Sequence, residues 1–189
     1  MNKKIQIVID KANFMIEGFE LTEIYEILTD YVTKDEAFLK RSDKYSFEKG
    51  LLVLGSVGTG KTQAFNVFRE ISRGSNNFFD VVSTRHIIRD YTVEGASVLS
   101  KYGRDSKRVI YFDDLGLEEV NAKMYGNNAN VMSEILMDRY ENFKRYGTKT
   151  FASSNLTPKQ LEEVYGARMR DRMKEMFNVI KIGGTSFRK

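Results

Sequence analysis

The chain has 189 residues, of which 41% are hydrophobic and 30% are charged, and its formal net charge at pH 7 is +4. These proportions are those of a globular chain with a real core, and they exclude a disordered one. The absence of cysteine excludes a disulfide framework and a thiolate metal site, and the single histidine, His86, argues against a histidine-based metal site or triad.

Charge is spread unevenly along the chain. Residues 1–49 carry 8 basic and 10 acidic side chains, whereas residues 166–189 carry 7 basic and 2 acidic ones. A basic carboxyl-terminal region indicates contact with an anion, which is a nucleotide, a nucleic acid or the acidic face of a partner. No apolar run approaches the roughly 20 residues of a membrane span. Asp10 and Lys11 interrupt the first apolar stretch, so we expect no signal peptide and a cytoplasmic protein.

Helical spacing of apolar residues marks the first part of the chain. It predicts an amphipathic helix over residues 19–32. Thr33 and Glu36 have the spacing of a capping box, which predicts a second short helix that runs to Lys40. Neither segment contains recognisable chemistry, and we take residues 1–45 as a short helical N-terminal segment.

Strands alternate with helices from residue 46 onward. Strands are predicted at residues 51–54, 79–83, 109–112, 148–155 and 179–182, and the first and third of these are continuous apolar runs. Helices are predicted after the first run, over residues 84–104 with a break near Gly95, over residues 131–147, from Pro158 onward and over residues 166–177, and a loop is predicted over residues 126–130. Thr157 and Gln160 form a capping box at the start of the helix at Pro158. This alternation predicts an α/β fold with a mainly parallel, five-stranded sheet flanked by helices.

The stretch GSVGTGKT fits the complete phosphate-binding pattern G-x-x-x-x-G-K-[ST]. Its members are Gly55, Ser56, Val57, Gly58, Thr59, Gly60, Lys61 and Thr62. Glycines let the backbone N–H groups point at phosphate oxygens, and the dipole of the following helix adds to the attraction. We expect Lys61 to reach the β- and γ-phosphates of ATP and the Thr62 hydroxyl to bind Mg²⁺.

Polar side chains end two further predicted strands. Asp113 follows the run VIYF and is placed to hold the Mg²⁺ that bridges the phosphates, and Asp114 beside it is placed to orient or deprotonate the attacking water. Asn155 ends the next strand, where an amide can hold the water or the γ-phosphate without adding charge. Asparagine after a strand is also a common turn residue.

The motif order GSVGTGKT, VIYFDDLG, SSNLTPKQL, GARMRDRM and GGTSFRK resembles the AAA+ ATPases of the DnaC/DnaI helicase-loader type and their IstB-like transposition relatives. The resemblance covers about residues 45–189. It implies an AAA+ type P-loop NTPase core over residues 46–189, without a C-terminal lid domain. It also implies ATP hydrolysis in DNA replication, with nucleotide-dependent self-association into a head-to-tail oligomer.

The resemblance assigns roles by position. Lys61 and Thr62 match the Walker A pair, Asp113 and Asp114 the Walker B acids, Asn155 sensor 1, Arg172 the arginine finger that acts on a neighbour's ATP, Arg168 a second arginine of that block, and Arg188 sensor 2. Arg170 is expected to be solvated. Asp114 stands where many AAA+ proteins carry the longer Glu, so we expect slow hydrolysis that depends on assembly. Because only about 45 residues precede the core, the protein partner, a replicative helicase or a transposase, stays open.

Single-stranded DNA is a further partner that the resemblance implies, through the helices between the second and third strands. The corresponding stretch offers the basic residues Arg85, Arg89, Lys101 and Arg104 together with Tyr91 and Tyr102. Basic groups that follow the phosphates and aromatic rings that stack on bases are the chemistry of such sites. Solvated helix faces carry the same residue types.

Two other functions fit the same motifs. A small-molecule P-loop kinase shares the length and the phosphate loop, and it closes arginines over the phosphates. Here the arginines are followed at once by a terminal strand, and no acceptor-binding motif follows the second strand. The third hypothesis is a nucleotide-gated binding protein with negligible hydrolysis.

Overall fold

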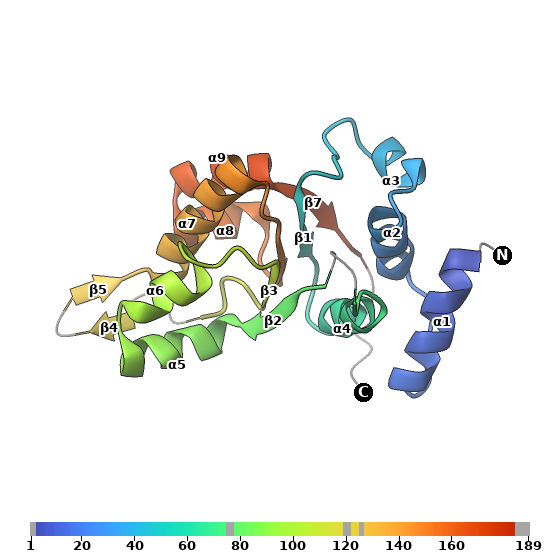
Figure 1. The fold of residues 1–189 in the computed structure, drawn as a ribbon, viewed down its shortest axis with the longest axis horizontal. Helices are drawn as coiled ribbons and strands as arrows, with labels where there is room; N and C mark the ends of the chain where they lie inside the picture. Colours follow the sequence, from blue (N-terminus) through green and yellow to red (C-terminus); the bar gives the residue numbers. More distant parts are fainter. Residues whose placement is uncertain (1–2, 75–77, 119–121, 125–126, 184–189) are drawn as a thin grey trace.

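Five strands form one all-parallel sheet, as the sequence predicts. The computed structural model describes residues 3–74, 78–118, 122–124 and 127–183. The sheet has the order β2-β3-β6-β1-β7 (Figure 1). Its strands are β1 (Gly50–Leu54), β2 (Asp80–Ser83), β3 (Ile110–Asp113), β6 (Thr150–Ser154) and β7 (Phe177–Lys181). β1 is a central strand, with β6 and β7 on its two sides.

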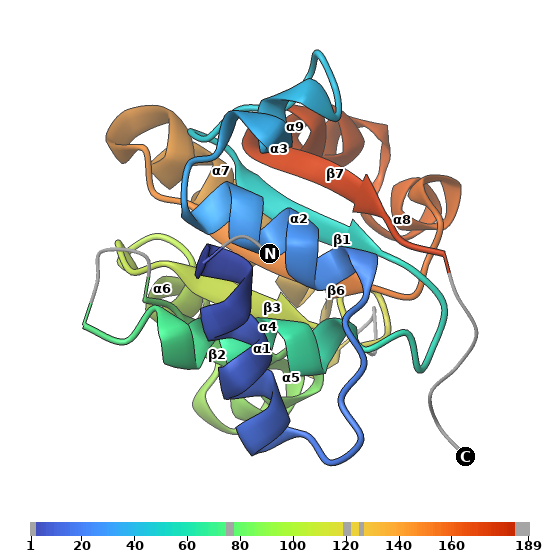
Figure 2. The same cartoon turned by 90° about the vertical axis from the view of Figure 1, so that its right-hand side faces the viewer.

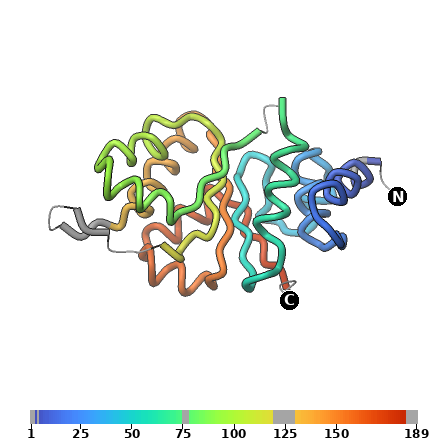
Figure 3. Tube along the Cα trace, turned by 90° about the horizontal axis from the view of Figure 1, so that it is seen from below, coloured from blue at the N-terminus to red at the C-terminus, as the bar shows by residue number. Residues whose placement is uncertain are grey.

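Helices cover both faces of the sheet, so the molecule has three layers (Figures 1 and 3). One face carries α1 (Lys3–Met15), α2 (Glu23–Val32), α3 (Glu36–Lys40) and α4 (Lys61–Ile71), and the other carries α5 (Thr84–Glu94), α6 (Ser97–Tyr102), α7 (Val131–Tyr146), α8 (Pro158–Tyr165) and α9 (Ala167–Met176). Alternate residues of β1 feed the two cores. Leu51 and Val53 pack with α1–α4, whereas Leu52 and Leu54 pack with the other helices. This alternation explains why the strand reads as one continuous apolar run.

The N-terminal segment is more helical than the sequence analysis predicted. α1 buries Val8 and Ala12 against the same core as α2 and α4 (Figure 2). The predicted capping box at Thr33 is wrong. Thr33 ends α2, and its hydroxyl donates to the Thr29 carbonyl at 2.9 Å. Asp35 is the N-cap of α3, because its backbone is extended and its carboxylate accepts a hydrogen bond from the Ala37 N–H at 3.1 Å.

Other local predictions are confirmed. α8 begins with the capping box of Thr157 and Gln160, with Pro158 in its first turn. Gly95 separates α5 from α6.

Where a loop was predicted over residues 126–130, the structure has a two-stranded antiparallel pair of β4 (Ala122–Met124) and β5 (Asn127–Ala129). In the described part of the chain, no helix combines the length and the apolar composition that crossing a lipid bilayer requires.

A buried arginine on α7 is hydrogen-bonded to segments at the amino end of the sheet. Arg139 is fully buried, and its three guanidinium nitrogens donate to four acceptors. These are Thr150 Oγ1 at 2.9 Å, the Ser106 carbonyl at 2.8 Å, the Arg108 carbonyl at 3.0 Å and the Lys149 carbonyl at 2.7 Å. Burial lowers the pKa of Arg139 to about 10. The residue therefore ties α7 to the segments that enter β3 and β6.

Candidate nucleotide and magnesium site

The sequence-predicted polar residues come together at the carboxyl end of the sheet. Parallel strands end at the same edge, and β6 lies between β1 and β3. Thr62, at the start of α4 after β1, therefore reaches Asp113 at the end of β3. Its hydroxyl oxygen lies 3.0 Å from both carboxylate oxygens of Asp113. Residues 51 positions apart in the sequence thus form one oxygen cluster.

The phosphate loop between β1 and α4 depends on three glycines. Gly58 and Gly60 have φ values of 86° and 81°, a left-handed conformation that side chains disfavour. At Gly55 a Cβ atom would lie 2.6 Å from Cγ1 and 2.9 Å from the carbonyl oxygen of Ile182, so only glycine fits. The Lys61 ammonium is buried in the loop and donates to the carbonyls of Gly55 at 2.6 Å and Ser56 at 2.8 Å.

Two buried hydroxyl groups are hydrogen-bonded to the Asp113 carboxylate. Its Oδ1 atom lies 2.6 Å from the Tyr111 hydroxyl and 2.7 Å from the Ser153 hydroxyl. Burial, and then the charge of Asp113, raise the pKa of Tyr111 well above its usual value, so this group stays a neutral hydroxyl. The sequence analysis missed both residues, because each is an ordinary inward-facing residue of a buried strand until the neighbouring strand is placed beside it.

Asp114 and Asn155 form a second polar pair beside this cluster. The Asn155 side-chain nitrogen lies 3.4 Å from Asp114 Oδ1. Asp114 has a φ of 60°, which is uncommon outside glycine and costs on the order of 1 kcal/mol. The Thr84 hydroxyl supports this conformation by donating to the Asp114 carbonyl at 3.1 Å. The left-handed turn separates the directions of the two adjacent carboxylates: Asp113 lies against Thr62, whereas Asp114 lies beside Asn155.

The oxygen cluster fits Mg²⁺. Asp113 and Thr62 offer only oxygen ligands, which is the preference of this ion. Within the described ranges, no group of three or more His, Cys, Asp or Glu side chains is placed to hold a metal ion by itself. A site with one carboxylate and one hydroxyl suits Mg²⁺, because this ion keeps several waters and shares the phosphates of a nucleotide.

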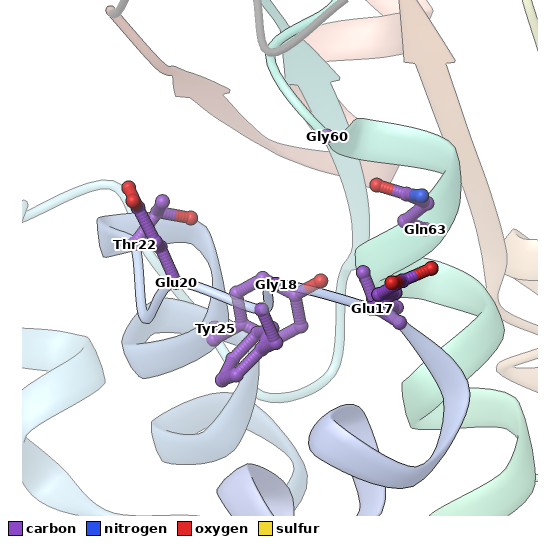
Figure 4. A pocket seen from close by; sticks show the side chains of 9 residues that line it. Glu17, Gly18, Glu20, Thr22, Tyr25, Gly60 and Gln63 are labelled. Carbon is purple, nitrogen blue, oxygen red and sulfur yellow. The ribbon is translucent and has the colours of Figure 1, made fainter.

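A pocket of about 360 Å³ lies beside the phosphate loop (Figure 4). The α1–α2 connector forms one side, and Gly60 and Gln63 at the start of α4 form the other. Its remaining lining residues are Ile16, Glu17, Gly18, Phe19, Glu20, Thr22 and Tyr25. The sequence analysis gave this connector no role, since no motif marks it; only its placement against α4 does.

Comparisons with known proteins support this picture at the level of the fold. No protein-family model and no curated protein sequence matches the chain. Solved structures do match. A protein described as a primosome component of Streptococcus pyogenes is 18% identical, with 88% of this chain and 81% of that chain covered and a TM-score of 0.61. The DnaC helicase loader is also 18% identical, with coverages of 88% and 94% and a TM-score of 0.56.

A third match adds a nucleotide-bound structure. AMPPCP-bound DnaA from Aquifex aeolicus is 17% identical over 88% of this chain, which corresponds to 49% of that chain, with a TM-score of 0.59. This chain has an AAA+ type P-loop fold. The fold predicted from the motifs is therefore confirmed, and this fold places the phosphate loop, the two acids and Asn155 at one edge of the sheet.

The arginine helix, α9, ends at the amino end of the sheet, opposite to the edge that carries the chain's own phosphate loop. α9 buries Met169, Met173 and Met176, as predicted, and leads into β7, whose Phe177 pairs with Gly50 at the amino end of β1. The phosphate loop is at the opposite end of β1.

The three arginines of α9 differ in their surroundings. Arg172 is half-buried with its guanidinium 5.1 Å from the centre of the Tyr140 ring, and Arg168 is exposed. Arg170, which was predicted to be solvated, is 38% exposed and also pairs with Glu162 at 2.8 Å and with Asp171 at 3.0 Å. Arg188 lies outside the described residues.

The predicted DNA-contacting residues lie on α5, α6 and the turn that follows. Arg85, Arg89 and Arg104 are exposed, whereas Lys101 lies 3.5 Å from the Asp90 carboxylate and 3.8 Å from the Glu94 carboxylate. The aromatic rings are not free to stack on bases. Tyr91 is buried in the core, and the Tyr102 hydroxyl donates to Asp90 at 3.2 Å.

Proposed function

We propose that this chain binds and hydrolyses Mg-ATP and works as a helicase-loader-like AAA+ ATPase in DNA replication. One observation carries the proposal. The Thr62 hydroxyl lies 3.0 Å from both oxygens of Asp113, directly behind a phosphate loop whose glycines have the required left-handed conformations. The neighbouring pair of Asp114 and Asn155 supplies the groups that hydrolysis needs beyond binding.

The residues divide the work as follows. Backbone N–H groups of the phosphate loop bind the phosphates, and the Lys61 ammonium exchanges the carbonyls of Gly55 and Ser56 for phosphate oxygens. Thr62 and Asp113 hold Mg²⁺, which offsets negative charge on the phosphates when bound. Asp114 accepts a proton from the attacking water, and Asn155 orients that water by hydrogen bonding.

The pocket beside Gly60 and Gln63 is proposed to take the nucleoside part of ATP. It adjoins the first turn of α4, where the phosphates bind, and the Tyr25 and Phe19 rings give it apolar walls. Glu17 and Glu20 at its rim can accept hydrogen bonds from an exocyclic amino group (Figure 4). The structure of DnaA with AMPPCP supports a nucleotide ligand for this fold.

A complete site is proposed to need two subunits in a head-to-tail assembly. Arg172 is on the helix that leads to the amino end of β7, whereas the phosphate loop follows the carboxyl end of the adjacent strand β1. Its buried Nη1 atom has no hydrogen-bond partner among the residues that the structure describes. We propose that Arg172, or the more exposed Arg168, acts on ATP held by a neighbour, and that Arg188 acts as sensor 2. Hydrolysis by an isolated subunit is then slow.

Single-stranded DNA and a replicative helicase are the proposed partners. Arg85, Arg89 and Arg104 supply exposed positive charge, and their contribution would come from phosphate contacts rather than from stacking on Tyr91. The fold match to a helicase loader favours replication over the transposition role of IstB-like proteins. A small-molecule kinase is disfavoured, because the arginines of α9 are on a helix that leads directly into β7 of the central sheet.

The test combines two inactive variants. Lys61→Ala removes the cation of the phosphate loop, and Arg172→Ala removes the finger, which can contribute on the order of 10³–10⁵ in rate. In an equal mixture, about a quarter of the interfaces join an intact Lys61 to an intact Arg172. We expect ATP hydrolysis to return on mixing and to rise with protein concentration and with single-stranded DNA. Lys159→Ala, at an exposed lysine of α8, is the matched control. A mixture that stays inactive while subunits exchange would assign Arg172 no role in a neighbour's site.

A further inference from the structure

A connected group of buried hydroxyls lies next to the proposed ion site. Tyr111 and Ser153 are buried on adjacent strands, β3 and β6. Their hydroxyl oxygens lie 2.8 Å apart, and each lies within 2.7 Å of Asp113 Oδ1, at 2.6 Å for Tyr111 and 2.7 Å for Ser153. The three oxygen atoms thus form a triangle, and both hydroxyl groups donate hydrogen bonds to the carboxylate.

This triangle treats the two oxygens of Asp113 differently. Oδ1 accepts from both buried hydroxyls and from Thr62, whereas Oδ2 accepts from Thr62 at 3.0 Å. A carboxylate oxygen has about two lone-pair directions, so Oδ1 is occupied by the chain itself. Oδ2 is the oxygen that keeps acceptor capacity toward the carboxyl edge of the sheet.

The tyrosine is in turn fixed by the phosphate-loop helix. The Tyr111 ring stacks on Phe65 of α4, with ring centres 4.0 Å apart and an angle of 18° between the planes. Phe79 packs edge-on against the same ring at 6.2 Å. The Tyr111 hydroxyl therefore cannot follow Asp113 if that side chain rotates, because the ring is buried among aromatic neighbours.

We propose that Tyr111 and Ser153 are positioning residues that fix the orientation of the Asp113 carboxylate. Its Oδ2 atom then faces the position of the ion, beside Thr62, before Mg-ATP binds. The proposal rests on the proposed Mg-ATP function. A carboxylate held by a single rotatable bond would otherwise sample orientations that do not bind the ion. Outer hydrogen-bond partners of metal ligands typically change metal affinity by about 10–100-fold.

The test separates ion binding from nucleotide binding. Tyr111→Phe removes the hydroxyl and keeps the ring that stacks on Phe65. Binding of a fluorescent, non-hydrolysable ATP analogue is measured over a Mg²⁺ titration and in EDTA, and Mn²⁺ binding to the protein–analogue complex is followed by electron paramagnetic resonance. We expect Tyr111→Phe to weaken Mn²⁺ and Mg²⁺ binding about tenfold, with analogue affinity in EDTA unchanged. Ser153→Ala should weaken ion binding similarly, and the double variant by less than the product of the two effects, because both hydroxyls restrain one oxygen.

A second buried tyrosine provides the matched control. Tyr31→Phe removes a buried hydroxyl that donates to the Lys49 carbonyl at 2.6 Å, in the same hydrophobic core but away from Asp113. It should lower thermal stability as much as Tyr111→Phe does and leave Mn²⁺ affinity at the parent value. Equal Mn²⁺ affinity in Tyr111→Phe and the parent would overturn the positioning role while leaving the proposed function intact. A parent protein that binds the analogue neither with Mg²⁺ nor in EDTA would overturn both.

Discussion

The two ends of the parallel sheet differ in how their polar side chains are hydrogen-bonded. At the amino end, Arg139 donates to four acceptors of its own chain, and Asn142 adds a bond from its amide to the Gly103 carbonyl at 2.9 Å. At the carboxyl end, the Asp113 carboxylate lies against Thr62 at the start of the helix that follows the glycine loop, and Asp114 lies beside Asn155. The polar groups around Arg139 are bonded mostly within the chain, with the buried Ser106 hydroxyl as an exception, whereas the carboxyl end is arranged for a charged ligand.

This difference separates stability from function. A buried charge whose hydrogen bonds are all satisfied stabilises one arrangement of the strands that it contacts. Two neighbouring acids and a left-handed aspartate lower stability, and such features persist where function requires them. Substitutions at the amino end should therefore change the free energy of unfolding, and substitutions at the carboxyl end should change turnover.

The largest effect is expected at the amino end, for Arg139→Met. The methionine keeps the apolar stem but leaves buried carbonyls without donors, which we expect to lower the free energy of unfolding by about 3–5 kcal/mol in urea titrations. Arg145→Met, at an exposed position of the same helix, is the control and should stay within about 0.5 kcal/mol of the parent. A loss below about 1 kcal/mol for Arg139→Met would show that water or local rearrangement satisfies these carbonyls instead.

Asp114→Asn should show the opposite pattern at the carboxyl end. It removes the proposed proton acceptor, and general bases contribute about 10²–10⁴ in rate, so we expect turnover of ATP to fall at least a hundredfold. Asparagine tolerates the left-handed conformation, and one of two adjacent charges is lost, so the free energy of unfolding should equal or exceed that of the parent. Phosphate release and urea unfolding measure the two quantities, with Asp105→Asn, at an exposed loop position, as control. Parental turnover in Asp114→Asn would reduce this residue to a strand terminus.

The sequence predicted the carboxyl end far better than the amino end. Phosphate chemistry needs particular residues at particular spacings, so GSVGTGKT and the acids after VIYF identify the site before any strand is placed. The sequence did not predict the strand order, and it is the order seen in the structure that brings Thr62 to Asp113. The roles of Lys61, Asp114, Asn155 and Arg172 stay predictions, because geometry alone does not measure turnover.

The amino end gave no comparable signal. Arg139 sits on a helix among other charged residues, and its burial depends on carbonyls from residues 106, 108 and 149 that only the fold brings near. The same reason hid Tyr111 and Ser153. The first helix, α1, was missed because its apolar face is short and its partners, α2 and α4, come later in the chain. Thr33 was misread because two residues with capping side chains, Thr33 and Asp35, precede α3, and only the extended backbone at Asp35 decides between them.

The smallest expected effect is a difference in alkaline pH dependence between the two ends. Burial raises the pKa of Tyr25, in the pocket beside the phosphate loop, to about 12. Between pH 10 and 12 the unfolded chain therefore loses this proton and the folded chain keeps it, so the free energy of unfolding falls as pH rises. Arg139 acts in the opposite direction. Its pKa falls from 12.5 to about 10 on folding, so from about pH 10 upward the folded chain releases the proton first and gains stability.

Urea unfolding at pH 8, 9, 10 and 11 can resolve these signs through differences between variants. The gap between Tyr25→Phe and the parent should be constant up to about pH 9 and then move in favour of the variant, because phenylalanine has no proton to lose in the unfolded chain. The deficit of Arg139→Met should widen over the same range, because only the parent gains from early deprotonation of the guanidinium. Flat differences up to pH 11 would mean that both groups are hydrated in the folded chain. The contrast between an amino end whose polar groups bond mostly within the chain and a carboxyl end arranged for a ligand would then rest on hydrogen-bond geometry alone.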